Sequence, residues 1–123
     1  MKLSEAMNDN VSGWAIIRPD HLDIREIDFI EADEEPSLET MQEAVNGYIE
    51  HITLNYLVTI YDDDDTGRFR SEHLYEADGL VNEEGKLIGL PPNPIGTAWY
   101  GMDGHGDIIC GNLMVMFGKA RMK

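Results

Sequence analysis

Short runs of β-branched and aromatic residues, separated by turn-forming residues, set the strongest limit on what this chain can fold into. Such side chains suit a pleated, half-buried surface, so each run indicates a strand. We expect strands at 13–18, 48–53, 56–61, 80–81, 86–89 and 107–117. The imperfect alternation of 22–29 indicates a further strand, broken by a bulge or a turn. Because short turns join these strands, the sequence predicts an α+β fold on a mostly antiparallel sheet.

Three details of these strands are open to a structural check. A tight turn near Leu54-Asn55 is expected to join two strands, and 82–85 is expected to be a hairpin turn. Gly111 is expected to form a bulge in the last strand. That strand has alternating apolar side chains, with Leu113, Val115 and Phe117 on one face and Met114 and Met116 on the other. Both faces are therefore expected to be buried, the alternative being a methionine-rich binding face.

Two helices have clear end signals. Ser37 is a capping residue before a helix at about 37–46, and Gly47 suits the left-handed stop after it. Its apolar stripe follows helical spacing and consists of Leu38, Met41, Ala44 and Val45. Asn93-Pro94 predicts the start of a short helix at about 94–100. Residues 1–12 are polar and are expected to form a mobile arm or a short capping helix.

Composition places limits on class and partners. The 123 residues suit one domain, 1–123, and 9 basic against 24 acidic residues give a net charge of −15. This charge argues against direct binding of nucleic acid or of an anionic membrane. No apolar run is long enough to cross a membrane, and 1–10 lack the apolar core of a signal peptide. A single cysteine suits a reducing compartment, so we expect a cytoplasmic protein.

The acidic residues form two clusters. One extends from Asp20 to Glu50 and includes an acidic loop at 31–36, and the other is the run Asp62–Asp65. These acids either form a solvated face that keeps the protein soluble or dock on a basic groove. Carboxylates on one face of a strand repeat every ~7 Å, close to the phosphate step of a nucleic-acid strand. The second interpretation therefore includes imitation of a nucleic-acid backbone.

Four segments, in this order, carry a family resemblance: 13–18 (GWAIIR), 37–50 (SLETMQEAVNGYIE), 81–93 (VNEEGKLIGLPPN) and 107–112 (DIICGN). Together they cover about half of the chain, and they resemble domain-of-unknown-function family 3846, small proteins of bacteria and their phages. The resemblance implies a common fold and a phage or mobile-element setting, with the host cytoplasm as location. It implies no catalytic residues. The segments 31–36 and 55–78 depart from the pattern as insertions, and loops of this kind often carry function.

No motif for catalysis, metal or cofactor emerges. Asp62, Asp64, Thr66 and Gly67 fit the start of a calcium loop, but His73 stands where the closing carboxylate belongs. The histidines lack the spacing of a helical metal site, and no phosphate-binding glycine motif is present. Cys110 lies in an apolar segment and is expected to be part of the core. We therefore expect no enzyme, no metal and no cofactor.

Two hypotheses of function follow. The first is a non-enzymatic acidic protein of a phage or mobile element that occupies a basic surface of a host protein, as a nucleic-acid mimic or as an inhibitor of a host or defence enzyme. Its contact residues would be Glu31, Asp33, Glu34, Glu35, Asp62, Asp63, Asp64 and Asp65. The second is a protein that binds or sequesters a nucleotide or signal molecule between the sheet and the short helix, with Asn93, Trp99, Tyr100 and His105 as lining. An uncovered sheet edge would favour a homo-oligomer under either hypothesis.

Overall fold

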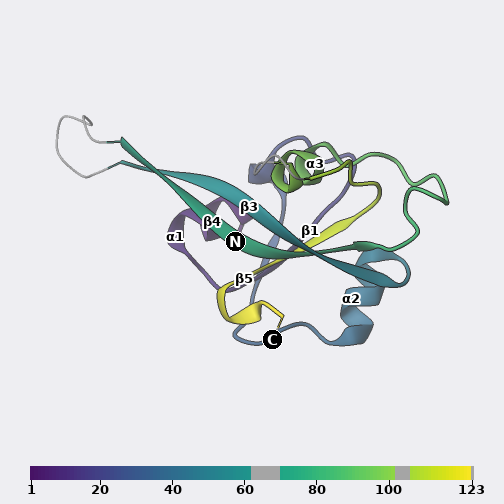
Figure 1. Ribbon diagram of the computed structural model, residues 1–123. Coiled ribbons are helices and arrows are strands. Elements are labelled where there is room, and N and C mark those ends of the chain that lie inside the picture. The colour runs from purple at the N-terminus through teal and green to yellow at the C-terminus, as the bar shows by residue number, and fades with distance from the viewer. Residues whose placement is uncertain (62–69, 102–105, 123) are drawn as a thin grey trace.

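The computed structural model describes residues 1–61, 70–101 and 106–122. It confirms the α+β class, with three α-helices and five strands (Figure 1). The helices are α1 (Leu3–Asp9), α2 (Leu38–Val45) and α3 (Pro94–Tyr100), with 3-10 turns at Ile24–Glu26 and Gly118–Ala120. The strands are β1 (Gly13–Ile17), β2 (Phe29–Glu31), β3 (Ile49–Tyr61), β4 (Arg70–Asn82) and β5 (Leu113–Phe117).

The strands form one antiparallel sheet in the order β2-β1-β5-β4-β3. β5 pairs along its whole length with β1, from Gly13↔Phe117 to Ile17↔Leu113. With β4 it pairs only from Asp78↔Met116 to Leu80↔Met114, whereas β3 and β4 pair over all 13 residues of each strand. The outer part of the β3–β4 hairpin is therefore a two-stranded ribbon, and it extends away from the helices in Figure 1.

Two apolar clusters fill the two faces of the sheet. Leu113, Val115 and Phe117 of β5 belong to the cluster that α1 and α3 cover, and Met114 and Met116 belong to the one under α2. All five side chains are at most 5% exposed, so the expected burial of both faces is confirmed. The methionines of β5 consequently form no binding face.

The helix ends follow local hydrogen bonds. The Ser37 side chain accepts a bond from the Thr40 N–H and caps α2, and Asn93 caps α3 in the same way, as predicted. The left-handed stop of α2 is Asn46 (φ 61°) and not Gly47, so that prediction was wrong by one position. The N-terminal segment is helical and not a mobile arm, because α1 buries its apolar side chains (Leu3 and Ala6).

Four strand predictions were wrong. The segment 48–61 contains no turn at 54–55, because β3 runs straight through these residues and pairs with β4. Residues 83–89 form turns and no return strand, since β4 already has β3 and β5 as neighbours. The segment 22–29 holds a 3-10 turn and only the first residue of β2. The last strand begins at Leu113 and not at 107, because Gly111 (φ 87°) bends the chain before it.

Candidate functional site

The acidic loop joins β2, an edge strand of the sheet, to α2. Glu31 ends β2 opposite Gly13, and the Ala32 N–H donates to the Ser12 carbonyl, so the start of the loop is held in place. The side chains of Glu31, Asp33 and Glu34 are exposed and that of Glu35 is half-buried. Within the described residues, none of these four carboxylates forms an ion pair. The loop therefore presents four uncompensated negative charges in five consecutive positions.

Most described cations are held by acids elsewhere. Lys2 pairs with Asp28 at 2.7 Å, Arg25 pairs with Asp23 at 2.7 Å, and Lys86 pairs with Asp107. In each pair the hydrogen bond from the basic group holds the pKa of the aspartate below its ordinary value. These exposed pairs contribute little to stability.

One lysine lies near the acidic loop. Lys119 lines the same shallow depression as Glu31 and Asp33, yet it forms no ion pair in the described structure. A depression with two carboxylates and one ammonium group keeps a negative field at its mouth. The loop is consequently open to an external cation.

The second predicted acidic segment, Asp62 to Asp65, lies outside the described residues. The same holds for Thr66 and Gly67 of the considered calcium loop. The structure therefore brings together only the first half of the predicted partner-binding set. In the part of the chain that is described, no group of three or more potential ligands is placed to hold a metal ion.

The residues predicted to line a ligand pocket have different roles in the fold. Asn93 is fully buried, and its amide nitrogen donates to the carbonyls of Ile17 (2.8 Å) and Gly111 (3.0 Å). Its amide oxygen accepts a hydrogen bond from the Gly96 N–H at 2.9 Å. Both ends of the amide therefore bond to the backbone of the fold and do not face a pocket. Trp99 is 8% exposed and stacks on Tyr56, with ring centroids 5.8 Å apart. His105 lies outside the described residues.

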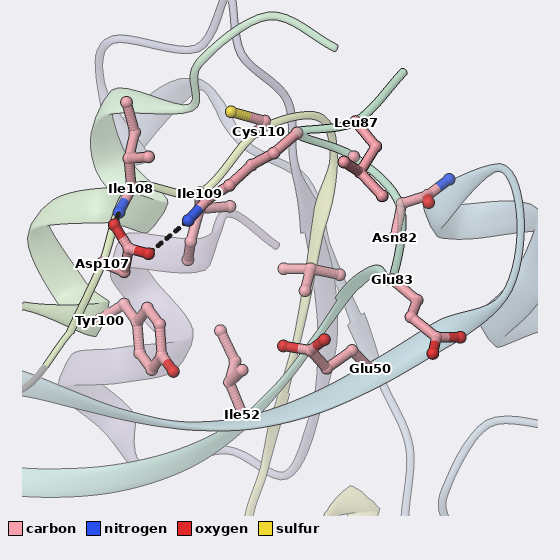
Figure 2. Close-up of a pocket in the computed structure, with 13 residues that line it drawn as sticks. Glu50, Ile52, Asn82, Glu83, Leu87, Tyr100, Asp107, Ile108, Ile109 and Cys110 are labelled. Carbon is pink, nitrogen blue, oxygen red and sulfur yellow. Dashed lines mark hydrogen bonds and ion pairs between the residues drawn. The ribbon is translucent and has the colours of Figure 1, made fainter. Parts of the chain in front are cut away.

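Tyr100 does line a pocket, of about 320 Å³, between the end of α3 and the first part of the β3–β4 hairpin (Figure 2). Its wall holds the carboxylates of Glu50, Glu83 and Asp107, and the ammonium group of Lys86 that pairs with Asp107. These groups leave a net negative charge, which disfavours the phosphates of a nucleotide.

Cys110 also lines this pocket and is half-buried. The expectation that it lies in a core strand was therefore wrong. The chain before β5 instead forms a single bridge between Cys110 and Pro92.

A buried ionic cluster under the C-terminal segment had no signal in the sequence. Asp78 of β4 is 4% exposed and accepts hydrogen bonds from His51 Nε2 (2.9 Å), Arg121 Nη2 (3.2 Å) and the Met122 N–H (2.9 Å). Arg121 also pairs with Glu76 at 2.8 Å. Burial alone raises the pKa of Asp78, but the bonds from Arg121, His51 and Met122 outweigh it and hold the pKa below the ordinary value. Both carboxylate oxygens of Asp78 accept hydrogen bonds, so this residue anchors the C-terminal segment.

Comparisons with protein-family models, with curated proteins and with solved structures find no match to this chain. Within the described residues, every helix is too short or too polar to span a bilayer.

Proposed function

We propose that this protein is a non-enzymatic acidic binding protein that occupies a basic surface of a host protein. The observation that supports the proposal is the acidic loop, whose four carboxylates (Glu31, Asp33, Glu34 and Glu35) lack ion pairs in the described structure. Unpaired surface carboxylates keep their charge available for an external cation. The natural target is a nucleic-acid-binding enzyme, because its basic groove is built to receive closely spaced negative charges.

The setting of the proposal is a phage or mobile element, as the family resemblance of the sequence implies. In that setting, occupation of the groove would inhibit a host or defence enzyme by excluding its nucleic acid. A net charge of −15 accelerates encounter with a basic partner, and the binding should weaken as salt screens the charges. Asp62 to Asp65 would add to the same contact.

The test compares two variants of equal net charge. In one, Glu31, Asp33, Glu34 and Glu35 are replaced by lysine; in the control, four exposed acids elsewhere are replaced by lysine, namely Glu5, Asp9, Glu83 and Glu84. Each protein is immobilised and exposed to host lysate at low and at high salt, and retained proteins are identified by mass spectrometry. We expect a nucleic-acid-binding protein to be retained at low salt by the wild type and by the control, and to be lost by the loop variant. Equal retention by both variants would contradict a role of the loop.

The pocket in Figure 2 supports a second candidate, the binding of a small molecule. Its volume of about 320 Å³ lies at the lower end of the range for small-ligand sites. The excess of carboxylates favours a cationic or neutral polar ligand over a nucleotide. Native mass spectrometry of protein purified from infected cells, compared with a Tyr100→Ala variant, checks this candidate. A ligand mass on the wild type alone would support it, and two bare proteins would argue against it.

A further inference from the structure

β3 is an edge strand with an open side. It is the outermost strand of the sheet, and within the described residues β4 is its only hydrogen-bonded neighbour. The open side extends over the 13 residues from Ile49 to Tyr61. Strands in globular proteins are usually five or six residues long, so this edge is unusually extended. A row of unpaired backbone N–H and C=O groups of this length is a template for another strand.

The sequence of β3 lacks the devices that protect an edge. Natural edges carry lysines, prolines or bulges, or they are very short. β3 reads IEHITLNYLVTIY, with Glu50 as its one acid and with no lysine, arginine, proline or glycine, in a chain of which 27% of the residues are charged. The opposite edge, β2, has only three residues and ends in the acidic loop. β3 is thus a long edge with a single acidic residue, near its start, on a strongly charged protein.

Exposed leucines mark the outer part of the hairpin. Leu57 of β3 lies directly opposite Leu74 of β4, and their exposures are 49% and 58%. Both side chains project from the same face as His51 and Asp78, beyond the region that α2 covers. Among the residues that the structure describes, the ribbon has no third strand at this point, and two-stranded hairpins are only marginally stable in water. A neighbouring strand would both pair the open edge and cover the leucines.

We propose that this neighbour is β3 of a second copy, paired antiparallel about a twofold axis at Leu57. This register pairs residues 53–61 of the two copies and joins the two sheets into one of ten strands. It sets Leu74, Leu57 and the same two residues of the second copy in one row across four strands. The interface is isologous, as in most homodimers.

The charge distribution favours a second copy over a charged partner. The paired segment holds no acidic or basic side chain, so it offers nothing specific to a basic or an acidic strand. The nearest acid of β3 is Glu50, and in the proposed register the two copies of Glu50 lie ~48 Å apart along the strands. This separation is several times the Debye length of about 8 Å at physiological salt. The two copies of Glu50 therefore do not oppose the pairing.

The first test is the mass of the full chain in solution, measured by sedimentation equilibrium over a concentration series. We expect twice the 13.9 kDa of one chain for the wild type. Leu57→Lys should weaken the dimer at least tenfold, because it opposes two ammonium groups on the axis. Leu87→Lys, at a leucine that is 89% exposed and outside β3, is the matched control and should leave the dimer intact. A monomeric wild type, or equal effects of the two lysines, would overturn the proposal.

Two further measurements test whether pairing through β3 causes dimerisation. Circular dichroism should show the same fold for Leu57→Lys as for the wild type, since position 57 is exposed in one copy. Added salt should strengthen the dimer by screening two like-charged proteins, whereas docking on a basic partner weakens with salt. The two proposals can therefore fail independently. A dimer that dissociates as salt rises would contradict pairing through the uncharged edge.

The register has its own test. In a Cys110→Ser background, Leu57→Cys places two thiols opposite each other on the axis, at a Cα separation of about 4.5–5.5 Å that suits a disulfide. Mild oxidation should link this variant covalently into a dimer and leave Leu87→Cys in the same background unlinked. A dimer that forms but is not linked through position 57 would refute the register.

Discussion

Replacing Asn93 with alanine tests how the fold holds α3 against the sheet. The amide nitrogen of Asn93 donates to the carbonyls of Ile17 and Gly111, and its oxygen caps α3 at the Gly96 N–H. Loss of the cap costs ~1 kcal/mol. Each buried carbonyl that loses its donor adds ~1 to 1.5 kcal/mol. The expected total is about 3 to 4 kcal/mol, out of a stability of about 5 to 15 kcal/mol for a typical domain.

The assay is urea unfolding, followed by tryptophan fluorescence and by circular dichroism. Asn112→Ala is the matched control, because this half-buried asparagine gives a single bond, to the Ala44 carbonyl at 3.1 Å. We expect Asn112→Ala to lower the free energy of unfolding by about 1 kcal/mol. Asn93→Asp keeps the capping oxygen but turns a carboxylate oxygen toward the two carbonyls, so it should cost at least as much as alanine. The reasoning would be refuted if Asn93→Ala and Asn112→Ala lowered the free energy of unfolding equally. It would also be refuted if Asn93→Asp lowered it clearly less than Asn93→Ala.

Two further predictions concern the sheet. The lowered pKa of Asp78 means that its ionised form stabilises the fold above the unfolded pKa of about 4, and that this contribution is lost as pH falls through the folded pKa. Asp78→Asn should therefore lose less stability than the wild type as pH falls, measured as urea midpoints from about pH 2 to pH 7. The same pH dependence in the variant and the wild type would contradict this. A Cβ at Gly13 (φ 154°) would lie 2.1 Å from the Ile30 carbonyl oxygen, so Gly13→Ala should cost at least ~3 kcal/mol. Gly89→Ala, which meets no atom within 4 Å but has φ 73°, should cost only ~1 kcal/mol in the same urea unfolding assay, and equal losses would argue against the clash.

Local signals in the sequence predicted the helices well. The caps of α2 and α3 depend on side chains that bond to a backbone N–H three residues later, here Ser37 to Thr40 and Asn93 to Gly96. Such bonds form within one turn and need no knowledge of the rest of the fold. The same is true of the apolar alternation in β5, which identified the two buried faces.

Features that depend on distant partners were not predicted. The turn expected at Leu54-Asn55 is absent because β4 pairs with every residue of β3. A signal was present, since Ile52, Leu54 and Tyr56 alternate and are all at most 6% exposed. No such signal exists for Asp78 and Arg121, which are 43 positions apart and meet only in the folded sheet.

The place of β5 sets the order in which this protein can fold. β5 follows the other four strands along the chain, yet it lies in the centre of the sheet, between β1 and β4. The β1–β2 and β3–β4 pairs can form early. The two pairs join into one sheet only when β5, which ends at Phe117, inserts between β1 and β4. Most of the native contacts are consequently between residues far apart in the sequence, which favours slow folding. Before that insertion the open sides of β1 and β4 are both exposed, so this is the stage at which the chain depends most on protection by a chaperone.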